Sequence, residues 1–292
     1  MSILPKPRFR FYGSSTNYAI IARDLARRDP GDGAEVHRAE RAVAEFVGAT
    51  EAVAIPQARV GVYMALKALI QPGQEVVLSP YTIYEVINMV ICAGGKPVFG
   101  DIERATCNID AQEIEALVNE KTGAVLVTHL HGLACDIERI RDVCHHNSIP
   151  LIEDCAQAFG CTVAGQRVGT FGQAGIYSFG MAKNVNSFFG GMLVTDDHVL
   201  ANRIRNEIAS WPYFDRKTLM HRVAFCLAGD VITSKPVFWM GPYWAFRYGY
   251  LHNVRALNNQ LRGEADPVRK DRIPETYLRQ LRPVSYTHLT LP

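Results

Sequence analysis

The feature that most constrains the fold is a regular alternation of two sequence textures between about residues 50 and 200. Short runs rich in apolar and β-branched residues alternate with longer segments whose apolar residues recur at helical spacing. Because the short runs are apolar on both faces, they predict a mainly parallel sheet that is covered by helices. The predicted strands are 52–55, 75–78, 97–102, 124–129, 150–154, 175–179 and 192–195, and the predicted helices between several of them are 60–69, 84–93, 111–119 and 136–145.

With 292 residues, 48% of them hydrophobic, the chain is long enough for one large domain and part of a second. A helix predicted at 33–47 leads into the alternating region, and another at 197–209 follows it. Next comes an aromatic-rich region, about 211–250, that prolines interrupt. Residues 283–292 continue no earlier pattern, and we interpret them as a non-native tail. The expected organisation is an N-terminal arm (1–32), a large domain (33–210) and the start of a truncated small domain (211–282).

Charge, cysteine pattern and hydropathy argue against several classes of protein. The formal net charge of +2 does not indicate a nucleic-acid partner. Seven scattered cysteines without a Cys-x-x-Cys pair indicate reduced thiols in the cytoplasm. No signal-peptide pattern opens the chain, and no stretch of about 20 apolar residues predicts a membrane span. We therefore expect a cytoplasmic protein without a nucleic-acid or membrane partner. An amphipathic, partly exposed segment between Val223 and Tyr250 is an alternative that the sequence leaves open.

Two reactive groups follow runs that are predicted to be strands of the sheet. Asp154 ends the apolar run 150–154, and Lys183 follows shortly after the run 175–179. Ligands of open α/β sheets gather at the carboxyl ends of the strands, so both groups are candidates for a site. A lysine at a hydrophobic strand end can lose its proton through desolvation and act as an amine nucleophile. An acid that pairs with a pyridinium nitrogen is the other group that pyridoxal-5'-phosphate (PLP) chemistry requires.

Each of these groups alone also has an ordinary structural explanation. An aspartate after a strand usually caps a helix or a turn, and a lysine is usually solvated. We interpret His145 and His146, beside Cys144, as solvated residues at a helix end. No second cluster of ligands follows them, so we expect no metal site.

Several blocks of sequence together resemble the motifs of the DegT/DnrJ/StrS aminotransferases, which act on nucleotide-linked keto-sugars. Residues 152–160 (IEDCAQAFG) resemble that family's EDxAQAxG motif. The blocks keep the family's order and spacing from about residue 35 to 205. The others are 94–101 (GGKPVFGD), 128–132 (THLHG), 169–172 (GTFG), 178–183 (SFGMAK) and the glycine pair Gly190–Gly191.

The resemblance implies a PLP-dependent transferase of fold type I, which is aspartate-aminotransferase-like. It predicts a mixed, mainly parallel seven-stranded sheet with helices on both faces, with residues 33–210 as the PLP-binding domain. It also implies that Lys183 carries the cofactor and moves a proton between substrate and cofactor. Asp154 would bind the pyridine nitrogen, Gln157 would lie near the phenolic oxygen of the ring, and Ser178 would bind the cofactor phosphate.

Three positions depart from the family's pattern. Its phosphate-binding Ser-Gly-Thr turn falls on Gln57–Arg59, where both hydroxyls are lost and Arg59 offers a guanidinium suited to phosphate. Ala58 and Arg59 are still expected to contact the cofactor there. The aromatic ring that stacks on the cofactor falls on Ile83, so Tyr84 or His129 is expected to replace it, and His129 is also expected to contact the substrate. The third departure is Phe188–Phe189, which replaces a Gly-Glu pair.

The activity that the resemblance implies is a ping-pong aminotransfer in polysaccharide biosynthesis. Glutamate or glutamine would give its amino group to the cofactor, and a nucleotide-linked keto-sugar would then receive it. Family members are homodimers, so a homodimer is expected. Two alternatives remain: a PLP-dependent sugar dehydratase, which carries histidine in place of Lys183, and a non-catalytic sugar-binding or regulatory relative.

Overall fold

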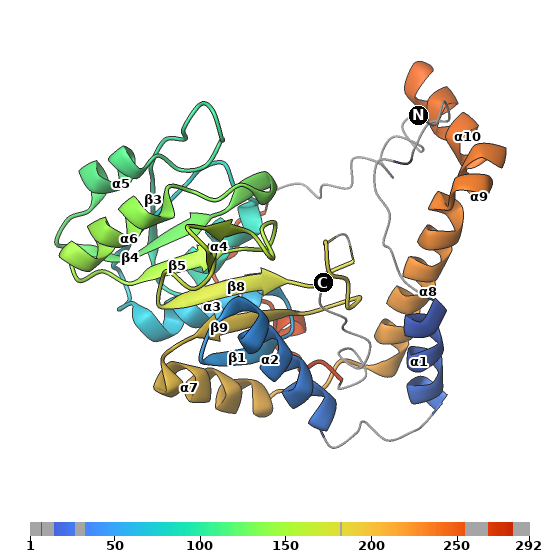
Figure 1. The fold of residues 1–292 in the computed structure, drawn as a ribbon, viewed down its shortest axis with the longest axis horizontal. Coiled ribbons are helices and arrows are strands. Elements are labelled where there is room, and N and C mark those ends of the chain that lie inside the picture. Colours follow the sequence, from blue (N-terminus) through green and yellow to red (C-terminus); the bar gives the residue numbers. More distant parts are fainter. Residues whose placement is uncertain (1–6, 8–14, 27–32, 182, 255–267, 283–292) are drawn as a thin grey trace.

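The computed structural model describes residues 7, 15–26, 33–181, 183–254 and 268–282. The expected tail at 283–292 and part of the expected N-terminal arm therefore lie outside the described residues. Figure 1 shows an α/β body built around a sheet, with a column of helices standing beside it.

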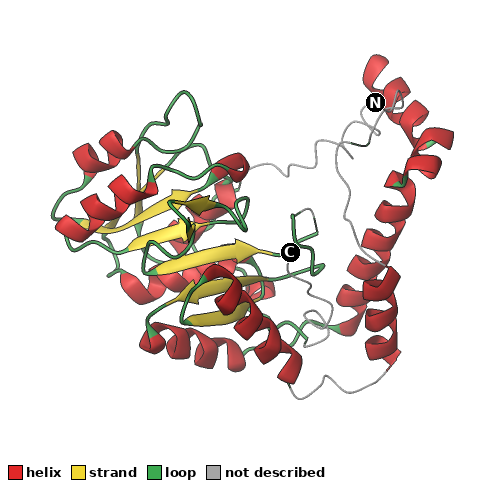
Figure 2. Cartoon of the chain, in the orientation of Figure 1, coloured by secondary structure: helices red, strands yellow, loops and turns green. Residues whose placement is uncertain are grey.

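A seven-stranded mixed sheet forms the centre of the body (Figures 1 and 2). Its strand order is β1-β9-β8-β5-β4-β2-β3. The strands from β8 to β3 are parallel to their neighbours, whereas β9 is antiparallel to both β8 and β1. This arrangement confirms the predicted mixed, mainly parallel sheet. The strands are β1 (Glu51–Ile55), β2 (Glu75–Leu78), β3 (Lys96–Phe99), β4 (Thr122–Thr128), β5 (Leu151–Asp154), β8 (Ala174–Ser178) and β9 (Gly191–Thr195), and β6 (Thr162–Val163) pairs with β7 (Gln166–Arg167) in a separate hairpin.

Helices cover both faces of the sheet, as predicted. On one face α3, α4 and α7 pack into a core with the apolar residues of the central strands. On the other face α2, α5 and α6 complete two further apolar clusters. The central strands are buried from both sides, which explains their uninterrupted apolar character. These helices are α2 (Ala34–Val47), α3 (Ala58–Leu69), α4 (Tyr84–Cys92), α5 (Ala111–Leu117), α6 (Ile137–His146) and α7 (His198–Ala209), with a 3-10 turn η1 at Leu130–Gly132.

Two predicted elements are shorter than the sequence suggested, for local reasons. The strand predicted at 97–102 ends at Phe99, because Phe99 pairs with Leu78, the last residue of the neighbouring β2. The helix predicted at 111–119 ends at Leu117, where the Asn119 amide donates a hydrogen bond to the Leu117 carbonyl (2.9 Å). Side-chain hydrogen bonds of this kind stop helices and are hard to foresee from periodicity.

The aromatic region after α7 is helical, which the sequence did not predict. It contains α8 (Arg216–Thr233), α9 (Lys235–Met240) and α10 (Pro242–Leu251), followed by a 3-10 turn η2 at Glu275–Tyr277. Pro236 and Pro242 lie in the first turns of α9 and α10. A proline there sacrifices no helical hydrogen bond, so these prolines begin helices where the sequence suggested interruption. Of the helices that the structure describes, none is long and apolar enough to cross a membrane.

The α8 helix is joined to the body by an apolar cluster that also includes α1 (Ser15–Ala26). Ile21 of α1 packs with Leu219 and Cys226 of α8 and with Phe188 and Phe189. Phe188 adopts a positive φ of 64°, a region that favours glycine and is uncommon for an aromatic residue. The departure from the family's Gly-Glu pair therefore coincides with a strained residue that packing holds in place.

Candidate active site

The carboxyl ends of β5 and β8 bring the two predicted reactive groups into one region. The two strands are parallel neighbours, with Asp154 opposite Ile176, so both end at the same edge of the sheet. Asp154 is the last residue of β5, and Lys183 lies in the connection from β8 to β9. Burial lowers the pKa of Lys183, and the nearby Asp154 carboxylate opposes part of this shift. The two groups are therefore close enough to interact through their charges.

Both groups retain atoms that can bind a ligand. Asp154 is buried, and its Oδ1 accepts a hydrogen bond from the Ala156 N–H (3.0 Å). The Asp154 Oδ2 accepts no hydrogen bond from the described residues, and the Lys183 Nζ donates none to them. Burial raises the pKa of Asp154, while the Ala156 hydrogen bond and the Lys183 charge lower it. A buried carboxylate and a desolvated amine with free polar atoms form a pair that a ligand can complete.

The neighbouring acid, Glu153, has a structural role that the sequence did not reveal. Successive residues of a strand point to opposite faces, so Glu153 points away from Asp154. Its carboxylate is completely buried and accepts three backbone hydrogen bonds, from Gly169 (2.7 Å), Phe171 (2.7 Å) and Gly172 (2.8 Å). These donors belong to the GTFG block, so Glu153 holds the backbone of that block against β5 by hydrogen bonds.

The structure corrects the interpretation of His129. Its ring is fully buried, Nε2 lies 3.1 Å from Glu153 Oε2, and Nδ1 accepts the Cys135 N–H (3.0 Å). Because Nδ1 is an acceptor, Nε2 carries the proton and donates it to Glu153. Neither ring nitrogen is available to a substrate, and the buried ring offers no open face for stacking. His129 instead belongs to the network that Glu153 organises.

The same network contains a donor set that could hold a metal ion. His129, Glu153 and Cys155 each place a ligand atom within 4.8 Å of the others. However, the Glu153 oxygens already accept backbone hydrogen bonds. Burial raises the pKa of the Cys155 thiol to about 12, whereas metals bind the thiolate. The arrangement is therefore better explained as a closed hydrogen-bonded network.

A second part of the site lies where α3 begins beside β8 and β9. Ser178, the last residue of β8, is paired with Gly191. A Cβ atom at Gly191 would lie 2.2 Å from the Tyr177 carbonyl oxygen and 3.5 Å from the Ala58 nitrogen, so the backbone segments approach closely here. Gln57, the N-cap of α3, provides no side-chain cap. The first amides of α3 are thus left to bind an anion beside the Ser178 hydroxyl.

Arg59 points into a group of charged and aromatic side chains. Its guanidinium lies 3.5 Å from Glu85 Oε2 and donates to the Tyr277 hydroxyl (3.3 Å). Burial, together with the nearby Arg59, lowers the pKa of Arg222. Arg222 and Gln57 line a pocket of about 370 Å³, which places positive charge beside the start of α3. Arg59 is therefore a partly buried, paired residue and not a solvated surface one. Its ion pair with Glu85 competes with the binding of an anion by the guanidinium.

Aromatic and amide side chains surround the remaining edge of the site. Ile83 is exposed and Tyr84 half-buried at the start of α4. Tyr81, also exposed, lies with its ring centroid 6.3 Å from that of His131. The Gln157 side-chain oxygen accepts the His131 N–H (3.1 Å), which leaves its NH₂ group free to face a ligand. Tyr81 lies three residues before Tyr84 and is a second aromatic candidate that the family pattern did not indicate.

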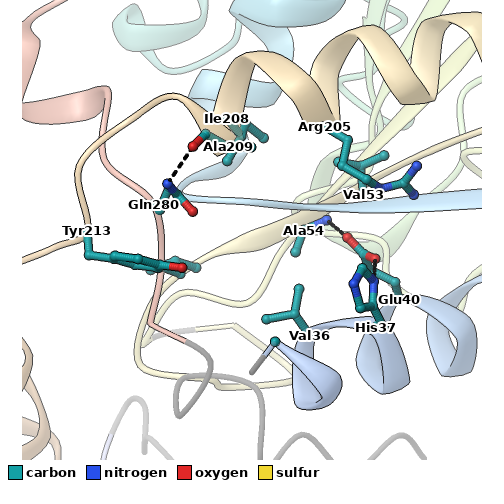
Figure 3. A pocket seen from close by; sticks show the side chains of 12 residues that line it. Val36, His37, Glu40, Val53, Ala54, Arg205, Ile208, Ala209, Tyr213 and Gln280 are labelled. Carbon is teal, nitrogen blue, oxygen red and sulfur yellow. Dashed lines mark hydrogen bonds and ion pairs between the residues drawn. The ribbon is translucent and has the colours of Figure 1, made fainter. Parts of the chain in front are cut away.

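Another hollow, of about 220 Å³, lies among α2, β1, α7 and the segment after residue 268 (Figure 3). Several of its polar groups are already paired, although the buried Nε of Arg205 has no hydrogen-bond partner among the described residues. Glu40 accepts the Ala54 N–H (2.9 Å) and contacts His37 (3.1 Å), and Gln280 donates to the Ala209 carbonyl (3.1 Å). None of the predicted site residues lines it. Its chemistry therefore gives no reason to place the reaction there.

Comparison with known proteins gives consistent matches. The profile described as the DegT/DnrJ/EryC1/StrS aminotransferase family matches residues 26–218. GDP-perosamine synthase from Vibrio cholerae is 35% identical over 179 residues, 60% of this chain and 49% of that protein. The spore coat polysaccharide biosynthesis protein SpsC from Bacillus subtilis (strain 168) is 40% identical over 174 residues, 59% of this chain and 45% of that protein.

A solved structure agrees with the sequence matches. An aminotransferase from Psychrobacter cryohalolentis superposes with a TM-score of 0.67 and 30% identity, over 71% of this chain and 53% of that one. The chain spans about half the length of the curated relatives it matches.

The Glu153 network makes a prediction about stability. Glu153→Gln should lower the free energy of unfolding by about 3 kcal/mol or more, because hydrogen bonds to a charged acceptor are lost and an NH₂ group faces backbone donors. Glu115→Gln is the control, since that carboxylate is exposed and pairs with Arg139 on the surface (2.9 Å). The control should change stability by less than about 0.5 kcal/mol. Urea denaturation measures both, and equal effects would contradict the role given to Glu153.

Proposed function

Because the chain belongs to the DegT/DnrJ/EryC1/StrS aminotransferase family, we propose that it contributes the PLP-binding part of a nucleotide-sugar aminotransferase. The observation that carries this proposal is the pairing of a desolvated Lys183 with a buried Asp154 at the carboxyl edge of the sheet. A desolvated amine can react with the aldehyde of the cofactor, and a carboxylate with a free oxygen can bind its pyridine nitrogen. The proposal extends to residues 33–210 as the PLP-binding domain.

The donor set fits PLP from ring to phosphate. Asp154 Oδ2 is free to accept a hydrogen bond from the protonated pyridine nitrogen, and the Gln157 NH₂ group is free to donate to the phenolic oxygen. Ser178 and the first amides of α3 provide donors for the phosphate, where the close approach at Gly191 leaves room for no side chain. When bound, PLP supplies an electron sink that stabilises negative charge on a substrate carbon.

The chain's own residues would then divide the work by position. The Asp154 carboxylate would hold a proton on the pyridine nitrogen throughout, because its burial makes that charged contact strong. The Lys183 Nζ would carry the cofactor and move a proton to and from the substrate carbon, and its lowered pKa favours the neutral amine this requires. Tyr84, and Tyr81 beside it, would supply the aromatic edge against which the ring is positioned.

The substrates are proposed from the relatives. GDP-perosamine synthase and a polysaccharide biosynthesis protein are among them, so we infer a nucleotide-linked keto-sugar as amino acceptor and glutamate or glutamine as donor. We also propose a homodimer in the cytoplasm, and the seven free cysteines are compatible with a reducing compartment. Lys183 disfavours the dehydratase alternative, in which histidine would replace it.

The assignment of Lys183 is tested by covalent trapping. With the unmodified chain, borohydride should attach PLP to Lys183, which peptide mapping locates. Lys183→Ala should lose both the label and aminotransfer while its far-UV circular dichroism is unchanged, because the side chain is an anchor and proton carrier. Lys121→Ala, an exposed control, should keep the label. A label on another lysine of the unmodified chain would reject the assignment.

Asp154→Asn tests the proton held at the pyridine nitrogen. The variant should still bind PLP but transfer amino groups about 10²–10³-fold more slowly, because a neutral amide replaces the charged partner. Asp142→Asn, at an exposed position on α6, should leave the rate unchanged. Single-turnover kinetics with saturating donor measures the step. If Asp154→Asn proved as fast as the unmodified chain, Asp154 would have no part in the mechanism.

Arg59→Ala tests whether the guanidinium replaces the family's hydroxyl-bearing turn. Losing one charge-assisted hydrogen bond should weaken PLP affinity by about one to two orders of magnitude. Lys67→Ala is the control on the same helix, because Lys67 pairs with Glu207 (3.0 Å) at the other end of α3. Titration of the apo-protein with PLP measures both. Unchanged affinity in Arg59→Ala would mean that Arg59 serves the Glu85 ion pair alone.

A further inference from the structure

The outer face of α8 is apolar although no described residue covers it. Met220, Leu227 and Val231 lie on one side of the helix at helical spacing, and each is about half exposed (51%, 46% and 51%). The adjacent side of the helix, which carries Leu219 and Cys226, packs on α1 and the body. An apolar face of a helix is ordinarily packed against another element. The outer face of α8 is therefore a surface without an occupant among the described residues.

The surface continues on α9 and α10, where it becomes aromatic. Trp244, Tyr248 and Leu251 share one side of α10 at positions i, i+4 and i+7, and all three are exposed. Met240, at the end of α9, is 77% exposed. We call Met220, Leu227, Val231, Met240, Trp244, Tyr248 and Leu251 the arm surface. Figure 1 shows α8 to α10 extending away from the sheet, and each side chain of the arm surface is at least 46% exposed.

The charges around the arm surface are almost all positive. From residue 216 to 254 the chain has five basic residues and one acidic residue. The acidic one, Asp230, is buried and accepts a hydrogen bond from the Tyr18 hydroxyl (2.7 Å), so it does not offset the basic side chains outside. Arg247 lies beside the Trp244 ring, 5.8 Å from its centroid, so a positive charge accompanies the aromatic part of the surface. The basic residues are Arg216, Lys217, Arg222, Lys235 and Arg247. Arg222 packs over the Phe189 ring on the body side, so the other four are the ones that can accompany the arm surface.

We propose that the arm surface docks on an anionic lipid surface, with Trp244 and Tyr248 at the level of the headgroups. Exposed tryptophan and tyrosine, aliphatic side chains and surrounding basic residues are the combination that binds membrane interfaces. A second copy of the chain would bring the same positive charges against this surface and repel it, whereas an anionic lipid surface attracts it. The expectation of no membrane partner rested on the lack of a spanning segment, and interfacial binding needs none. The proposal is independent of the aminotransferase activity, and the family match ends at residue 218, before most of this surface.

Sedimentation of the whole chain with lipid vesicles tests this docking. The protein should bind vesicles of phosphatidylcholine mixed with phosphatidylserine, bind pure phosphatidylcholine more weakly, and dissociate as salt is raised. The double variant Trp244→Ser, Tyr248→Ser and the single variant Arg247→Glu should each bind at least about tenfold more weakly. Val199→Ser and Lys96→Glu are matched controls, because they remove an exposed apolar residue and an exposed basic residue of the body. Both controls should bind as the unmodified chain does.

Tryptophan fluorescence gives a second measurement that needs no variant to fold. Brominated lipids in the mixed vesicles should quench the emission of the unmodified chain, and Trp244→Phe should lose much of this quenching. No sedimentation and no quenching with the unmodified chain would overturn the proposal. Binding that the arm-surface variants and the controls weaken equally would also overturn it. A dimer that Trp244→Ser, Tyr248→Ser dissociates, without vesicle binding, would assign the arm surface to a second copy of the chain instead.

Discussion

The candidate site depends on one buried carboxylate, that of Glu153. A charge in the interior is tolerated only where donors replace its water, and here three backbone amides and the His129 ring do so. Two of these amides belong to the glycines of the GTFG block, and Gly169 adopts a positive φ of 95° to present its N–H. The result is a closed hydrogen-bonded network around the residue that precedes Asp154 in β5. Two adjacent acids thus differ in role: Glu153 accepts backbone hydrogen bonds, and Asp154 is the one proposed to bind the ligand.

The sheet and its helices were predictable because they follow periodicity, which packing reinforces. The position of Asp154 and Lys183 at one edge of the sheet was also predictable, since the carboxyl end of a strand is a place that topology specifies. The roles of Glu153 and His129 were not, because a sequence does not show which of two acids points inward or where a ring nitrogen finds its partner. The helices α8 to α10 were misjudged for a different reason. Pro236 and Pro242 look disruptive in a sequence, and only their position in a first turn makes them compatible with helices.

One departure from the family's pattern is explained by the helices that stand beside the body. Phe188 and Phe189 replace small and charged residues, and they pack against α1 and α8. Arg222 of α8 lies over the Phe189 ring (3.6 Å to the centroid). The unusual sequence next to the site therefore belongs to the contact that holds α8 in place. A substitution that would look damaging in isolation is part of one apolar cluster.

The antiparallel return of β9 has a further consequence for how the site assembles. Parallel strands must be joined by long crossovers, but β8 and β9 are consecutive and pair with each other, with Ser178 opposite Gly191. The connection between them, residues 179–190, carries Lys183 and is therefore closed by strand pairing at its base. Closing so short a loop costs little entropy, and its contacts are local in the chain. We expect the lysine to be set in place by an early, local folding event, whereas Asp154 joins it only when β5 pairs in parallel with β8 across a longer connection.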